Sequence, residues 1–396
     1  MARDLHSSSS GEIQHVRSSS WRISSNRHNV IHPVDIDTPP PSAAPTPSPV
    51  VYREVKHFKK WTVWLVPCFI ASNTVMFLIT MAVNNCPKNS VHCIGRFLGR
   101  LSFQSFKENP LLGPSSSTLL KMGALQVSRV VDKRQVWLLI TCIWLHGGLF
   151  HLLANMLSLV LIGIQLEQEF GFVRIGCLYL ISGLGGSLMS ALFIQSNISV
   201  GASGALFGLL GGMLSEIITN WTIYSKKVAT LVTLLAIIAV NLAVGILPHV
   251  DNFAHMGGFL SGFFLGFVIL IRPQYSWITQ KYTPPGFIST SIKPKFQMYQ
   301  RTLWAISLIV LITGFTLGLV MLLRGVNAND YCSWCHYLSC VPTSRWSCKT
   351  SPSFCTASQV GNNWNLTCSG SGESHIYTLP SATSSQINGL CSEVCG

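Results

Sequence analysis

The segment GASGALFG, Gly201 to Gly208, opens an apolar stretch over residues 200–219 that is long enough to cross a membrane as a helix. Small residues every four positions let two helix backbones approach closely, and this stretch has Gly204, Gly208 and Gly212. The apolar stretch 252–271 carries a matching ladder of Gly258, Gly262 and Gly266. We therefore predict two membrane helices in close contact, with Ser203 three or four residues into the first.

The composition of the whole chain is that of a membrane protein. Hydrophobic residues make up 48% of the 396 positions and charged residues only 10%, whereas soluble domains carry about 25% charged residues. Seven stretches have the length and apolarity of a spanning helix, or nearly so: 61–83, 149–166, 172–195, 200–219, 228–247, 252–271 and 303–323. The sequence therefore predicts an all-α polytopic membrane protein. Its net charge of +13 is assigned to loops, because no segment resembles a basic, aromatic-interleaved nucleic-acid-binding domain.

The positive charges of the short loops predict how the helices are oriented. Lys and Arg gather just before the first stretch and in the loops 220–227 and 272–302, whereas the loops 196–199 and 248–251 contain neither. Cytosolic loops carry the excess of Lys and Arg. We therefore expect a cytosolic N-terminus and, after seven crossings, a luminal C-terminus. The basic loop 84–136 falls on the luminal side, against the charge rule. Long loops translocate largely regardless of charge, so this does not change the predicted orientation.

Ten of the thirteen cysteines fall on the predicted luminal side: Cys86 and Cys93 in the first long loop, and eight between Cys332 and Cys395. Even-numbered clusters in an oxidising compartment predict disulfides, although the Cys332–Cys335 spacing leaves zinc as a rival interpretation. A sequon at Asn365 predicts a glycan in the same tail. These features favour the secretory pathway, in Golgi, other endomembrane or plasma membrane. The Ser- and Arg-rich N-terminus leaves a plastid or mitochondrial membrane as the alternative.

The chain divides by composition into five segments. Residues 1–60 are predicted to be a disordered Ser/Pro-rich cytosolic arm. The remaining segments are a core at 61–272 with a long first loop at 84–148, a basic cytosolic loop at 273–302, a membrane helix at 303–323 and a Cys-rich luminal tail at 324–396. The apolar end of the first loop, residues 136–148, predicts a loop that dips into the membrane boundary.

Four polar residues inside the spanning stretches are candidates for chemistry, because polar groups are costly in a membrane. Ser203, His255, His151 and Asn155 all lie near the luminal start of their helices, at similar depth. If the two glycine ladders face each other, the His255 imidazole can take the Ser203 proton and activate the hydroxyl as a nucleophile. His151 and Asn155 are four residues apart and share a helix face. With the backbone N–H of Ser203 they could stabilise an oxyanion.

Each candidate also has a simpler interpretation. A serine in a membrane helix often serves packing or bonds to the backbone, and a membrane histidine can be structural. The His151–Asn155 pair could be part of a metal site or an interhelical hydrogen bond. Asp251, four residues before His255, invites a catalytic-triad interpretation but could face water. Glu216 is expected to extend to the cytosolic surface. The shared depth and the paired glycine ladders favour the catalytic interpretation.

Three segments carry a family resemblance: HGGLFHLLANM (146–156), GASGALFG (201–208) and AHMGGFLSGFFLG (254–266). In type, order and membrane placement they resemble the motifs of rhomboid intramembrane serine proteases, over about residues 130–275. The resemblance implies a six-helix rhomboid core, and a seventh C-terminal transmembrane helix is the layout common in eukaryotic secretory members. The tail and the Ser-rich arm resemble those of plant members.

The resemblance also implies the chemistry of the site. Ser203 would be the nucleophile and His255 the general base and acid of a dyad without an acid partner, while His151, Asn155 and the Ser203 backbone N–H would form the oxyanion hole. An aromatic ring at Phe207 would support the histidine, and the supporting glycines would be Gly201, Gly204 and Gly258. No metal and no cofactor are implied. The partners would be the lipid bilayer and single-pass membrane proteins cleaved near the luminal end of their helix, with no nucleic acid.

One residue departs from the family pattern. Trp137 is followed by Leu138, where rhomboids often carry arginine. This departure bears on how the first loop is anchored and on full activity, although it removes no catalytic group. The alternative function is therefore a catalytically weak or inactive rhomboid-like membrane chaperone or trafficking factor.

Overall fold

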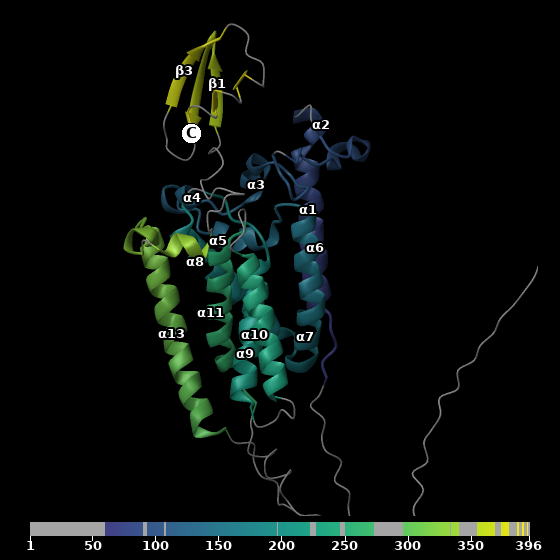
Figure 1. Ribbon diagram of the computed structural model, residues 1–396, viewed down its shortest axis with the longest axis vertical. Helices are drawn as coiled ribbons and strands as arrows, with labels where there is room; N and C mark the ends of the chain where they lie inside the picture. The colour runs from purple at the N-terminus through teal and green to yellow at the C-terminus, as the bar shows by residue number, and fades with distance from the viewer. Residues whose placement is uncertain are drawn as a thin grey trace, which may run out of the picture. The chain divides into compact units, whose positions relative to one another are not determined.

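The computed structural model describes residues 60–89, 93–106, 108–195, 197–221, 227–245, 250–272, 296–332, 334–339, 355–368 and 374–379, with a few positions between 386 and 394. The predicted arm 1–60, apart from Lys60, and most of the predicted basic loop 273–302 lie outside the described residues. Helices make up most of the described chain (Figure 1).

Five helical segments are long and apolar enough to cross a membrane, which confirms the polytopic helical class. They are α1 (Leu65–Asn84), the run from α6 (Leu149–Ser158) through a π-helical turn (Leu159–Gly163) into α7 (Ile164–Phe170), α8 (Phe172–Phe193), α11 (Asn252–Ile269) and α13 (Met298–Leu323). Two shorter apolar helices are α9 (Ser203–Thr219) and α10 (Lys227–Val244). These elements match the seven predicted stretches to within a few residues, and the number of crossings stays a prediction.

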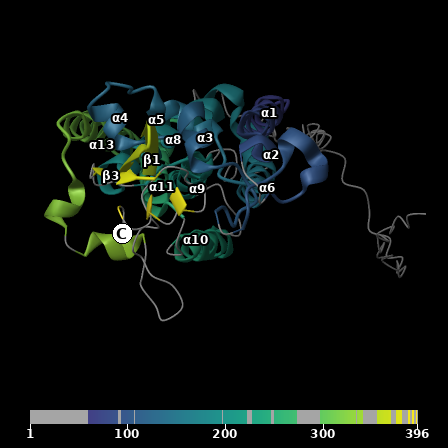
Figure 2. The same ribbon diagram turned by 90° about the horizontal axis from the view of Figure 1, so that it is seen from above.

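The centre of the bundle is the contact of α9 with α11, which both pack on α8. Seen from above, α9 and α11 lie between α13 and α6 (Figure 2). The two glycine ladders face each other, as predicted: a Cβ on Gly258 would overlap the carbonyl oxygen of Gly204, and one on Gly262 would overlap that of Gly208. The sequence did not indicate that α8 joins this contact, where a Cβ on Gly186 would lie 2.6 Å from the Ala254 carbonyl oxygen.

The predicted first loop, 84–148, contains short helices: α2 (Cys86–Asn89), a 3₁₀ segment η1 (Arg96–Leu101), α3 (Ser116–Met122), α4 (Val127–Val131), α5 (Leu138–Thr141) and a 3₁₀ turn (Cys142–Trp144). Leu138 is 2% exposed and belongs to the main hydrophobic core. Apolar packing of Leu138 thus holds the loop at the position that departs from the family pattern.

The prediction that Glu216 extends to the surface is wrong. Glu216 is 4% exposed and accepts a hydrogen bond from Asn220 Nδ2 at 3.1 Å. Arg272, just after α11, places Nε 3.7 Å from its carboxylate, bonds Glu169 at 2.9 Å and covers the Phe170 ring. The carboxylate stays inside because this guanidinium and the amide compensate its desolvation.

Disulfides form in the first loop and in the tail, and the tail also contains a small sheet. Cys86 is bonded to Cys93 and Cys332 to Cys335, which confirms disulfide formation for these cysteines. Because the sulfurs of Cys332 and Cys335 are joined to each other, they are not available as zinc ligands. Beyond them, β1 (Cys355–Val360), β2 (Asn363–Cys368) and β3 (Ser374–Thr378) form an antiparallel sheet in the order β1-β2-β3, which the sequence analysis did not predict.

Candidate active site

Ser203 is the first residue of α9, so the prediction that it lies three or four residues inside the helix is wrong. The helix starts late because Gly201 has a φ of +131°, a backbone conformation that side-chain-bearing residues rarely adopt. The 17 residues of α9 span about 25 Å, less than the ~30 Å of bilayer hydrocarbon. A helix of this length can place its first residue below the membrane surface.

Gly201 brings Ser203 and His151 together. A Cβ on Gly201 would lie 2.7 Å from His151 Cε1, 2.8 Å from His151 Nε2 and 3.7 Å from Ser203 Oγ. The backbone N–H of Gly201 donates to the Cys142 carbonyl oxygen at 3.0 Å. The first loop therefore fixes the turn before Ser203 and leaves room for the imidazole only because residue 201 has no side chain.

His255 is the fourth residue of α11 and is 8% exposed. Its ring stacks on Phe207, with 4.3 Å between ring centroids and an interplanar angle of 14°. Among the described residues, its Nδ1 has no hydrogen-bond partner, and no hydrogen bond joins the ring to Ser203. Such bonds are often long in an unliganded enzyme and shorten in the complex. Phe207 thus holds the imidazole in a defined plane beside the start of α9.

Asn155 and His151 approach the same region from α6. Asn155 is 6% exposed, and in the described part of the chain its Nδ2 donates to no protein acceptor. The first N–H groups of α9, that of Ser203 among them, have no intrahelical acceptor. His151 also packs edge-on against His146, with centroids 5.3 Å apart. The structure therefore brings Ser203, Gly201 and His151 together, and Asn155 lies one helical turn after His151 on α6.

Both carboxylate oxygens of Asp251 bind groups other than the His255 ring. Its Oδ1 accepts the N–H of Ala254 at 3.0 Å and so caps α11, while Oδ2 accepts the hydroxyls of Ser190 and Ser199. Ser199 precedes the Gly201 turn and also pairs with Leu125 of the first loop. Asp251 thus ties the start of the His255 helix to the segment that carries Ser203. An aspartate directly before a helix is an N-cap signal, which could have revealed part of this role.

Replacing Asp251 with alanine is expected to lower stability by about 2 kcal/mol, because the cap is lost and two serine hydroxyls lose their acceptor. Asp251→Asn keeps a capping oxygen and should lose less. Thermal unfolding of the purified protein in detergent measures both changes. Equal losses in the two variants, or none in either, would contradict this account of the carboxylate.

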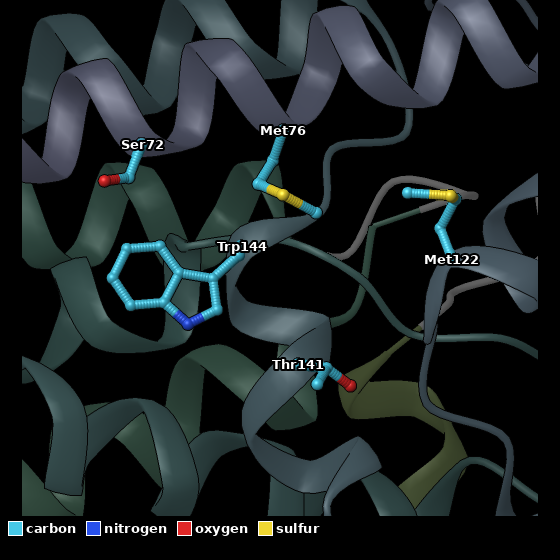
Figure 3. Close-up of a pocket in the computed structure, with 5 residues that line it drawn as sticks. All are labelled: Ser72, Met76, Met122, Thr141 and Trp144. Atoms are coloured by element: carbon cyan, nitrogen blue, oxygen red, sulfur yellow. The ribbon is translucent and has the colours of Figure 1, made fainter.

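A separate pocket of about 300 Å³ lies between α1 and the first loop. Ser72 and Met76 of α1 face Met122, Thr141 and Trp144 across it (Figure 3). None of the candidate catalytic residues lines this pocket. Its lining is mostly apolar and includes two hydroxyls, those of Ser72 and Thr141.

Comparison with known proteins places these observations in a family. Residues 133–272 match the Rhomboid domain. RHOMBOID-like protein 1 of Arabidopsis thaliana is 62% identical over 87% of this chain and 88% of its own length. RHOMBOID-like protein 6, mitochondrial, from the same plant is 50% identical over 73% of this chain and 95% of its length, and Inactive RHOMBOID-like protein 8 is 42% identical over 74% and 84%.

Proposed function

Because the chain belongs to the rhomboid family, whose proteases act on proteins within the bilayer, we propose that it is an intramembrane serine endopeptidase with a Ser203–His255 dyad. Its substrates are single-pass membrane proteins, cleaved near the luminal end of their helix. The observation that carries the proposal is the interlocked α9–α11 contact, with Ser203 one residue before Gly204 and His255 three before Gly258.

In the proposed mechanism His255 takes the proton of the Ser203 hydroxyl as the oxygen attacks the scissile carbonyl, and then returns it to the leaving amine. Water hydrolyses the resulting acyl-enzyme with the same imidazole as base. The stacked Phe207 ring keeps the imidazole oriented. The negative charge of the tetrahedral intermediate is stabilised by Asn155, His151 and the Ser203 N–H.

The proposed substrate class follows from the depth of the site. A peptide bond within an intact helix is shielded by the helix's own hydrogen bonds, so small and helix-weakening residues should mark the cleavage site. Substrate helices would have to unwind near the end of the bundle where α9 and α11 begin. The proposed partners are accordingly membrane proteins and the bilayer itself.

A second candidate is a membrane chaperone or trafficking factor without proteolysis, because a similar plant protein is described as inactive. A fluorophosphonate probe separates the two, since only an activated serine reacts covalently. We expect labelling of the wild type and none of Ser203→Ala. Ser182→Ala, which removes a buried serine hydroxyl from α8, is the control and should label normally. A wild type that resists the probe would favour the chaperone.

We further propose a cytosolic N-terminus, a luminal tail and residence in the secretory pathway, with a plastid or mitochondrial membrane as the alternative. Asn365, on β2, should then carry a glycan. Asn220, also in a sequon, should not, because it is buried and bonded to Glu216 and Leu270. The change in electrophoretic mobility on glycosidase treatment, compared among wild type, Asn365→Gln and Asn220→Gln, tests this. A glycan that is lost in Asn220→Gln, no loss of glycan in Asn365→Gln, or a tail open to cytosolic thiol reagents in intact vesicles contradicts the topology.

A further inference from the structure

We propose that the Cys332–Cys335 disulfide is a thiol–disulfide exchange site, and that its reduction by a dithiol loosens the start of the helix that carries His255. The disulfide lies in residues 327–339, here called the strap, which follow α13 and are all described except Ser333. The inference depends neither on proteolysis nor on the side of the membrane that the tail occupies.

The first half of the strap, which contains η4 (Ala328–Tyr331), is anchored to α8. Ala328 belongs to the main hydrophobic core, and the Asn329 side-chain amide donates to the backbone carbonyl oxygen of Phe193, the last residue of α8. Carbonyl groups at a helix end have no intrahelical donor, and this bond satisfies one of them. The Phe193 ring in turn stacks on Phe253 of α11, with 4.3 Å between centroids. The strap therefore begins at a fixed point beside α11.

The second half of the strap is anchored to the start of α11. Its segment η5 (Cys335–Leu338) ends at Leu338, whose carbonyl oxygen accepts a side-chain N–H of Asn252 at 2.7 Å. Asn252 is the first residue of α11 and is 4% exposed, so its amide has little water to turn to when this bond is lost. Leu338 therefore holds the helical turn that leads to His255.

The disulfide lies between these two anchors and keeps the strap short. The Cα atoms of Cys332 and Cys335 are 5.4 Å apart, whereas three extended residues span roughly 10 Å. The backbone N–H of Cys335 also donates to the Cys332 carbonyl oxygen at 3.2 Å and closes the same turn. Opening the S–S bond frees this turn to extend, so the hold of Leu338 on Asn252 weakens.

Three features suit this disulfide to exchange. Its cysteines have the Cys-X-X-Cys spacing, in which a thiolate forms more readily than from an isolated thiol. It joins residues only 3 positions apart, against 7 for Cys86–Cys93, and a short closed loop adds the least stability. Cys332 is partly exposed while Cys335 is 7% exposed, so the Cys332 sulfur is the one that a reductant reaches. Exposed disulfides are the ones that exchange readily.

The exchange is a two-electron transfer. A thiolate of the dithiol attacks Cys332 Sγ, the S–S bond breaks, and Cys335 leaves as a thiolate that takes up a proton. The second sulfur of the reductant then attacks the first within the mixed disulfide and releases Cys332, which takes up the other proton. The dithiol ends as a disulfide, and two electrons and two protons have passed to the cysteine pair.

Redox titration of the full chain in detergent tests the exchange site. The protein is equilibrated with graded mixtures of reduced and oxidised dithiothreitol, free thiols are alkylated, and mass spectrometry identifies the alkylated positions. We expect Cys332 and Cys335 to react at mixtures that leave Cys86–Cys93, the internal control, closed. Failure of the Cys332–Cys335 bond to open first would overturn the exchange site.

Hydrogen exchange in the same mixtures measures whether reduction reaches α11. The backbone N–H groups of Ala254 and His255 bond to Asp251 in the first turn of this helix. Opening the strap should speed their exchange about fivefold, the factor that corresponds to one net hydrogen bond. The first turn of α8 lies at the far end of that helix from Phe193 and should exchange as before. Unchanged exchange in α11, or an equal change at the start of α8, would overturn the coupling.

Three variants test the route. Asn252→Ala removes the second anchor, so the first turn of α11 should exchange fast in both redox states; a redox response of wild-type size would overturn the role of Leu338. Cys332→Ser combined with Cys335→Ser should match the reduced wild type without reductant, which separates this disulfide from the other tail cysteines, and exchange as slow as in the oxidised protein would overturn its part. The wild-type titration decides the case in which that variant does not fold. Ser203→Ala should keep the full redox response, because the coupling needs no catalysis.

Discussion

Ser203→Ala is expected to abolish cleavage of a membrane-embedded reporter, and His255→Ala should do the same. Loss of either member of a serine–histidine unit lowers turnover by a factor on the order of 10⁶. The physical reason is that neither group acts alone: the hydroxyl is a poor nucleophile without a base, and the imidazole has no hydroxyl to activate. The double variant should therefore be no slower than either single variant.

Cleavage is best measured with purified protein in vesicles, with Ser182→Ala as the control for loss of a buried hydroxyl. The control should retain activity, because Ser182 lies on α8 and has no place in the proposed chemistry. Substantial residual cleavage in both Ser203→Ala and His255→Ala would contradict the proposed dyad. If only His255→Ala stayed active, another base would have to be found among the buried groups, and His151 would be the first to test.

Gly258→Ala is expected to destabilise the protein by about 1–3 kcal/mol, the usual cost of overpacking. The added methyl group would overlap the Gly204 carbonyl oxygen, which is backbone and cannot rotate away. The helices α9 and α11 must then separate. Since Ser203 precedes Gly204, separation also widens the gap to His255, and cleavage should fall together with stability.

Gly314→Ala is the matched control, because α13 offers nothing within 4 Å of a Cβ at that position. It should be neutral or slightly stabilising, as alanine favours helix over glycine. Thermal unfolding in detergent and reporter cleavage in vesicles give the two readouts. A Gly258→Ala protein that unfolds and cleaves like Gly314→Ala would mean that the α9–α11 contact does not hold the site.

The sequence predicted the parts of this protein that depend on short-range pattern. Apolar stretches of sufficient length predicted the helices, and glycine spacing predicted which two would touch. Once Gly204 meets Gly258, the neighbouring positions of Ser203 and His255 are set by helical geometry alone. Composition likewise predicted the disulfide-bonded cysteines, because their chemistry depends on the compartment more than on the detailed fold.

Other features could not be predicted because they arise from residues far apart in the chain. The sheet at 355–378 shows no strong alternation in the sequence. Glu216 lies inside with Asn220 and Arg272 beside its carboxylate, and Arg272 reaches it from beyond α11. Leu138 departs from the family pattern, yet the core packs around it. Each outcome depends on which groups other segments bring within contact, and local periodicity carries no information about that.

The sequence by itself determined the helices, their closest pairing and the residue types available for chemistry, since these follow from hydrophobic length and from the space that glycine leaves. Only the tertiary structure decided how the site is held: the left-handed Gly201 turn that starts α9 at Ser203, the Cys142 carbonyl that bonds it, and Asp251 joining that segment to the His255 helix. The reason is physical. A buried polar group must find its partner, and the fold determines which one it meets.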